Sequence, residues 1–138
     1  MKRIALAAAI FTVMSANTCK SGDAAATAAD LAGKQWNLQS LAGEAVRLAD
    51  GQQPWVKAEP DGALSGFGGC NNLMGSMKLE GSSLSFPGLG STKKFCQNTN
   101  EVEMKFKNAL SSTTGFKLDG NTLTLLNGAT ELAKLVSN

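Results

Sequence analysis

The stretch SGFGGCNN, which runs from Ser65 to Asn72, brings three glycines, one cysteine and two side-chain amides into eight residues. A segment of this composition can cradle a phosphate, carry a nucleophilic thiol, hold a metal ion or turn a tight corner in a sheet. The rest of the chain distinguishes between these four interpretations.

A phosphate site is not favoured. A P-loop places Lys and then Ser or Thr directly after its glycines, so that an ammonium and a hydroxyl reach the phosphate and its metal. Here Cys70, Asn71 and Asn72 follow the glycines, and the segment has no GxGxxG spacing for a dinucleotide. We therefore do not expect this segment to bind a nucleotide.

Catalytic and metal chemistry lack their usual residues. The chain contains no histidine and no tyrosine, which removes every Cys-His and Ser-His-Asp arrangement. Lys93 or Lys94 could activate a thiolate, but exported thiols tend to be oxidised, and Glu101 and Glu103 are assigned to an exposed helix face. A zinc site needs about four ligands, more than two separated cysteines supply. We predict no catalytic residue, no metal site and no cofactor.

The N-terminus has the pattern of an export signal. Lys2 and Arg3 precede an apolar run from Ile4 to Met14, and polar residues follow at once. This run is shorter than the roughly 20 residues that a spanning helix needs. We predict a signal peptide over residues 1–18.

Cys19 lies where a lipoprotein signal places its lipid-modified cysteine, although the three residues before it match the usual lipobox imperfectly. The alternative is ordinary cleavage near Ala24–Ala28, which lies far from the apolar run. We predict lipidation of Cys19, a flexible tether over residues 19–30 and a folded domain over residues 31–138. The protein is then anchored in the cell envelope, in the outer membrane or facing the periplasm.

The charge balance argues against a nucleic-acid partner. The chain has 13 basic and 11 acidic residues, and loss of the signal removes Lys2 and Arg3, which leaves 11 of each sign. No basic excess remains to neutralise a phosphate backbone.

If Cys19 carries lipid, Cys70 and Cys96 form an even pair in an exported domain. A disulfide between them would close a loop of about 27 residues and stabilise the fold by roughly 3.6 kcal/mol on a chain-entropy argument. The opening stretch suits this role, because its other residues fit a tight turn. Those turn residues are Gly66, Gly68, Gly69 and Asn71.

The folded part reads mainly as short strands separated by glycine turns. Trp36 and Leu38 fall on one face of a first strand, and residues 63–67 form another after the Asp61-Gly62 turn. Further hairpins are expected at residues 78–86, at residues 117–125 and at Asn127-Gly128.

One segment, residues 100–110, changes to a helical period. Its apolar stripe consists of Val102, Phe106, Ala109 and Leu110. Asn100 is expected to cap this helix together with Glu103, and Gly115 to end it. The pairs Glu101–Lys105 and Glu103–Lys107 are expected on the outer face. The sequence predicts an α+β fold with one helix packed on an antiparallel sheet.

Several motifs together resemble the META domain family, also called HslJ-like. They are WxL from Trp36, LSGFGGCN from Leu64, Gly75, LxF from Leu84, TKKFC from Thr92, ExxFxxAL from Glu103 and LTL from Leu123. The resemblance covers residues from about Leu31 to the end, and GCN and TxxxC are its specific part. It implies an antiparallel, partly barrel-like sheet with one helix, in a bacterial envelope protein linked to stress tolerance. Met77 and Phe95 depart from the family's usual residues.

Three functions remain open. The leading one is a non-catalytic envelope lipoprotein domain that acts through a surface, in stress tolerance or in contacts with other envelope proteins. The second is a module for a small apolar ligand, with a pocket lined by Trp55, Phe67, Met77 and Phe95. The third is a thiol or redox enzyme built on the two cysteines. Trp55 and Phe95 are the candidate contact residues.

Overall fold

The computed structural model describes residues 26–138. Its helices are α1 (Ala28–Leu31) and α2 (Asn100–Ser112). Its strands are β1 (Gln35–Leu41), β2 (Glu44–Ala45), β3 (Trp55–Ala58), β4 (Ala63–Phe67), β5 (Asn72–Ser76), β6 (Lys78–Glu80), β7 (Ser83–Ser85), β8 (Gly90–Ser91), β9 (Gly115–Asp119), β10 (Thr122–Asn127) and β11 (Thr130–Ser137).

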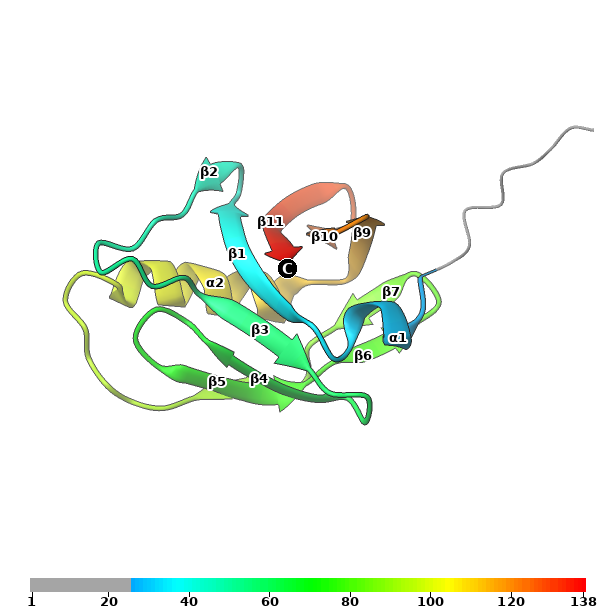
Figure 1. The fold of residues 1–138 in the computed structure, drawn as a ribbon, viewed down its shortest axis with the longest axis horizontal. Coiled ribbons are helices and arrows are strands. Elements are labelled where there is room, and N and C mark those ends of the chain that lie inside the picture. The colour runs from blue at the N-terminus through cyan, green and yellow to red at the C-terminus, as the bar shows by residue number, and fades with distance from the viewer. Residues whose placement is uncertain (1–25) are drawn as a thin grey trace, which may run out of the picture.

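All strand pairs in this part of the chain are antiparallel, and the strands form one sheet. Their order is β6-β7-β9-β10-β11-β1-β3-β4-β5-β8, with β2 paired to β1. β5 and β6 lie near opposite ends of this order, yet only Met77 separates them in the chain. The two ends of the sheet must therefore approach each other, and the sheet curls (Figure 1). The predicted α+β fold with a partly barrel-like sheet is confirmed.

The predicted hairpins form where the turn residues indicated them. β6 pairs with β7, β9 with β10 and β10 with β11. The glycine of each turn has a positive φ, of 60° at Gly81, 57° at Gly120 and 59° at Gly128. Glycine adopts this conformation without the steric cost that other residues have.

The core lies between the inner face of the sheet and α2. Trp36 and Leu38 of β1 are buried, as are Phe106 and Leu110 of α2, so the predicted faces of both elements are confirmed. α2 contacts β1, β7, β10 and β11, and Figure 1 shows it running behind β1 and β3. The hydrophobic core cluster is formed entirely by residues between 31 and 135.

The last residues of the segment that we predicted to be a tether, residues 19–30, belong to helix α1. Leu31 is buried there, and its carbonyl accepts a 2.9 Å hydrogen bond from Trp36 Nε1. At its start Thr27 donates backbone and side-chain hydrogen bonds to Asp30, and these hold the pKa of the Asp30 carboxyl below its ordinary value. This capping interaction therefore stabilises the fold above that ordinary pKa and is lost as the pH falls through the lowered one.

The start of α2 differs from the prediction. Thr99, not Asn100, is the N-cap residue, and its carbonyl accepts a 3.0 Å hydrogen bond from the Glu103 N–H group. The helix ends at Ser112, three residues before Gly115. Directly after this end, Thr113 Oγ1 donates a hydrogen bond to the Ala109 carbonyl. The expected capping box does not form, because the Glu103 side chain has other partners.

Gly66 of β4 packs against the backbone of β3. A Cβ atom at this position would lie 2.5 Å from the Trp55 carbonyl oxygen and 3.1 Å from Val56 Cγ1. The absence of a side chain therefore sets how closely these two strands approach.

Replacement of Gly66 by alanine should lower the free energy of unfolding by about 1–3 kcal/mol, because the new methyl group overpacks the strand pair. Gly90→Ala is the matched control in β8, since its Cβ would meet only Met74 Cγ at 3.7 Å. Urea unfolding of both variants measures the difference. Equal stability of the two variants would show that the close approach is not a constraint.

Candidate functional site

The Glu103 carboxylate lies buried beneath the opening stretch and accepts three hydrogen bonds from it. Oε2 accepts from the backbone N–H groups of Cys70 at 2.9 Å and Asn71 at 2.5 Å. Oε1 accepts from Asn71 Nδ2 at 2.7 Å. Only 5% of Glu103 is exposed. A buried carboxylate requires such donors, so α2 and the opening stretch depend on each other.

The expected place of Glu103 on an exposed helix face was therefore wrong, as was its pairing with Lys107. Lys107 Nζ instead donates to Ser91 Oγ at 2.8 Å. The other expected pair is confirmed, because Glu101 Oε1 lies 2.7 Å from Lys105 Nζ. This hydrogen bond lowers the pKa of the Glu101 carboxyl.

The Asn71 side chain connects the same corner to the loop before α2. Its Nδ2 group also donates to the Lys94 carbonyl at 2.9 Å. Its Oδ1 atom accepts from the Lys94 N–H group at 2.7 Å and from Thr92 Oγ1 at 2.8 Å. Asn71 is 4% exposed, and these bonds engage both ends of its amide. They give the threonine of the TxxxC motif a structural role at this corner.

Cys70 and Cys96 form a disulfide with a Cα–Cα distance of 5.8 Å. The predicted disulfide is confirmed, and neither sulfur is a free thiolate in this structure. The bond joins the opening stretch to the residues that lead into α2. We call Cys70, Asn71, Thr92, Cys96 and Glu103 the corner brace.

The glycines beside the brace are there for two different reasons. A Cβ on Gly68 would lie 2.6 Å from Glu103 Cγ, so a side chain would collide with the buried acid. Gly69 has a φ of +121°, which residues with a side chain rarely adopt. Gly66, by contrast, faces β3 and lies outside this contact.

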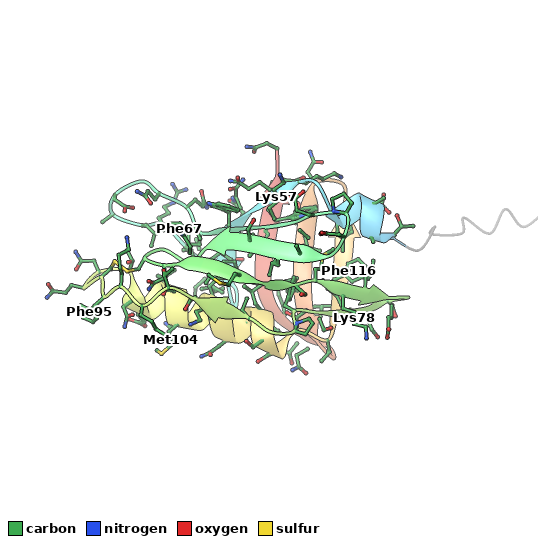
Figure 2. The ribbon with its side chains drawn as sticks, turned by 90° about the horizontal axis from the view of Figure 1, so that it is seen from below. Lys57, Phe67, Lys78, Phe95, Met104 and Phe116 are labelled. Carbon is green, nitrogen blue, oxygen red and sulfur yellow. A yellow bond between two sulfur atoms is a disulfide. The ribbon has the colours of Figure 1, made fainter. Side chains whose placement is uncertain are left out.

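Phe95 stands on the loop that the brace holds at both ends. It is 80% exposed, although its neighbours in the chain are bonded to Asn71 and Cys70. Figure 2 shows Phe95 at the same end of the molecule as Met104 of α2, which is 55% exposed. Aromatic side chains contribute strongly to the energetics of interfaces, so an exposed one on a loop held by these bonds is a candidate contact residue.

The other three residues of the predicted apolar pocket lie elsewhere in the molecule. Trp55 and Phe67 are half-buried cross-strand partners on β3 and β4. Met77 lines a hollow of ≈ 260 Å³ near α1. The structure thus brings Trp55 and Phe67 together, but does not gather them with Phe95 and Met77 into one pocket.

A groove of ≈ 590 Å³ lies between β2, α2 and the start of β11, and none of those four residues lines it. Sequence reasoning missed this groove because its walls come from three segments far apart in the chain. The sequence feature that could have indicated the groove was the apolar flank of α2. Val102 and Ala109 were assigned to the core, and they also line the groove.

The predicted signal peptide and Cys19 lie outside the described residues. Among residues 26–138, no helix has both the length and the apolar character needed to cross a membrane. Within this same part of the chain, no group of three or more His, Cys, Asp or Glu side chains could hold a metal ion.

Comparison with known protein families identifies a match. The META domain family model matches residues 29–137. No curated protein matches the chain.

Solved structures show the same fold. A protein solved by NMR is 26% identical, with a TM-score of 0.66, over 80% of this chain and 94% of its own. A Burkholderia xenovorans protein solved by NMR is 29% identical, with a TM-score of 0.60, over 78% of this chain and 83% of its own. A crystal structure of a DUF4847 family protein from Bacteroides vulgatus shares the fold at 16% identity, with a TM-score of 0.59, over 78% and 94% of the two chains.

Glu103→Gln should lower the free energy of unfolding by about 1–3 kcal/mol, the range for leaving a buried hydrogen-bonding group without a partner. However the new amide is turned, its NH2 group faces the Asn71 side-chain donor or the two backbone N–H groups. Asn71 cannot turn to accept it, because Lys94 and Thr92 occupy Oδ1.

Glu101→Gln is the matched control on the same helix, since it removes only an exposed ion pair and should change the free energy of unfolding little. Urea unfolding of both variants, with the disulfide intact, measures the two costs. Similar costs for the two variants would contradict the role assigned to Glu103.

Proposed function

The chain belongs to the META domain family, and on this premise we propose that it is an envelope lipoprotein domain that binds another envelope protein through Phe95 and has no catalytic role. The observation that carries the proposal is the exposure of Phe95 on a loop fixed by the corner brace. The link to stress tolerance that the family resemblance implies stays a prediction.

The fixed loop favours binding on energetic grounds. A large aromatic side chain on a flexible loop can fold back onto the protein, and binding must then pay for ordering it again. Here the Thr92 and Lys94 contacts with Asn71 and the bond at Cys96 order the loop in advance. Preorganised aromatic residues carry much of the binding energy in protein interfaces.

The residues around Phe95 indicate the charge of the partner. Lys93 and Lys94 are exposed, and neither lies in an ion pair within the part of the chain that the structure describes. Two free ammonium groups beside an aromatic side chain complement an acidic surface with an apolar pocket, and they would steer its approach.

The absence of a catalytic role is supported by how the reactive groups are used. Cys70 and Cys96 are bonded to each other, and the Glu103 carboxylate is occupied by donors from the opening stretch. The sequence also has no histidine to act as a general base at neutral pH. The chemistry of these residues is consistent with a scaffold.

A photoreactive phenylalanine derivative placed at position 95 of the full chain should form a discrete protein adduct in the envelope of a bacterial host. Lys78 is the control position, because it is exposed and lies at the other end of the molecule (Figure 2). Charge reversal at Lys93 and Lys94 should weaken the adduct at least fivefold. Identical adducts at positions 95 and 78, or none at 95, would contradict the proposal.

The predicted anchor has its own test in the mass of the mature protein extracted from membranes. We expect a chain that begins at Cys19 and carries added acyl mass, and a Cys19→Ser variant that lacks this mass. An unmodified N-terminus beyond Cys19 would show ordinary signal cleavage and would remove the lipid anchor from the proposal.

A further inference from the structure

The groove of ≈ 590 Å³ is separate from both the corner brace and the Phe95 loop. It lies on the side of the molecule where β2 stands above α2 in Figure 1. Its apolar wall is formed by residues of β1, the segment around β2, α2 and β11. These are Leu41, Ala45, Val46, Val102, Ala109 and Leu132. A volume of this size is within the range of small-molecule sites.

A second hollow of ≈ 310 Å³ adjoins the groove and has a different chemistry. The two share Ala45, Val46 and Arg47. Beyond these residues, the second hollow is lined by Gln39, Gln52 and Gln53, together with Leu48 and Gly51. The Gln53 side-chain nitrogen donates to the Leu38 carbonyl. An apolar cavity and an amide-rich one therefore meet at Arg47.

The charges around the groove leave Arg47 without a partner. Lys105 lies 2.7 Å from Glu101, and Glu131 lies 3.7 Å from Lys134. Within residues 26–138 no carboxylate oxygen lies within 4.0 Å of Arg47.

The remaining carboxylate of the groove wall, Glu44, interacts electrostatically with Lys105. The hydrogen bond that Lys105 donates to Glu101 raises the pKa of Lys105 most, and the charge of Glu44 adds a smaller effect. The cation left to receive an anionic group in these two hollows is therefore Arg47.

From this juxtaposition we infer that the groove binds a single-chain anionic amphiphile of the long-chain fatty acid class. The apolar chain lies between α2 and the segment around β2, and the carboxylate lies at the Arg47 guanidinium beside the glutamine amides. A guanidinium can give a carboxylate two parallel hydrogen bonds. A neutral chain would fill the groove but leave Arg47 unused, and a free anion would leave the apolar walls exposed to water.

Binding can be measured with the domain from residue 20 to 138, which contains the whole core described above. The probe is 11-(dansylamino)undecanoic acid, whose fluorescence reports entry into an apolar site, and the competitors are dodecanoate and dodecan-1-ol below their aggregation concentrations. We expect saturable binding of one probe per chain, and displacement by dodecanoate at least tenfold stronger than by the alcohol.

Two substitutions separate the two parts of the site. Arg47→Gln should weaken dodecanoate at least tenfold and change dodecan-1-ol less than twofold. Ala45→Phe, which fills the groove, should abolish binding of both. Ser112→Phe fills it from the opposite wall and should have the same effect, so it serves as the test if Ala45→Phe destabilises the domain. Lys57→Gln, which removes a cation outside both hollows, should change neither.

Absence of saturable probe binding, or binding that neither groove-filling substitution affects, would overturn the site. Equal affinity for the acid and the alcohol, or an Arg47→Gln variant that binds dodecanoate normally, would overturn the assignment of an anionic head group. These outcomes do not depend on the crosslinking at Phe95, because the two surfaces share no residue.

Discussion

The buried carboxylate of Glu103 is the constraint on which the rest of the structure depends. Its three donors all come from Cys70 and Asn71, thirty-odd residues away in the chain. A one-residue shift of α2 would turn Glu103 by about 100° and separate its carboxylate from these donors, leaving the buried N–H groups without an acceptor. The acid therefore fixes the register of the helix against the sheet. Asn71 and the disulfide extend this fixation to the loop before α2, so the opening stretch meets both this loop and α2 at one corner.

This constraint also bears on the position of both proposed binding surfaces. One surface begins at the loop that the corner brace holds, where Phe95 is displayed. The other lies along α2 itself, where Val102 and Ala109 line the groove. A helix that is held in register can present two surfaces at fixed positions. The fold thereby combines a hydrogen-bonded interior with exposed loop residues, as binding domains do.

The sequence predicted what depends on local chemistry. Hairpin glycines, alternating leucines and the helical stripe each act over a few residues, and the strands and α2 formed accordingly. Glu103 was placed wrongly because its partners come from a distant turn. Its spacing from Phe106 and Leu110, at i+3 and i+7, did place it on the buried face, and Gly68 left the room that it needed. The groove could not be predicted, since no local pattern tells how three separate segments meet.

The most direct test of this account is native-state hydrogen exchange at the backbone N–H groups of Cys70 and Asn71. Both groups belong to a turn near the surface, and a turn that is ordered only locally would release them without unfolding the domain. If the Glu103 carboxylate holds the structure together, both should exchange only through global unfolding, with the protection of the central β1 and β11 amides. Exchange of these two groups at rates typical of exposed loops would contradict the account.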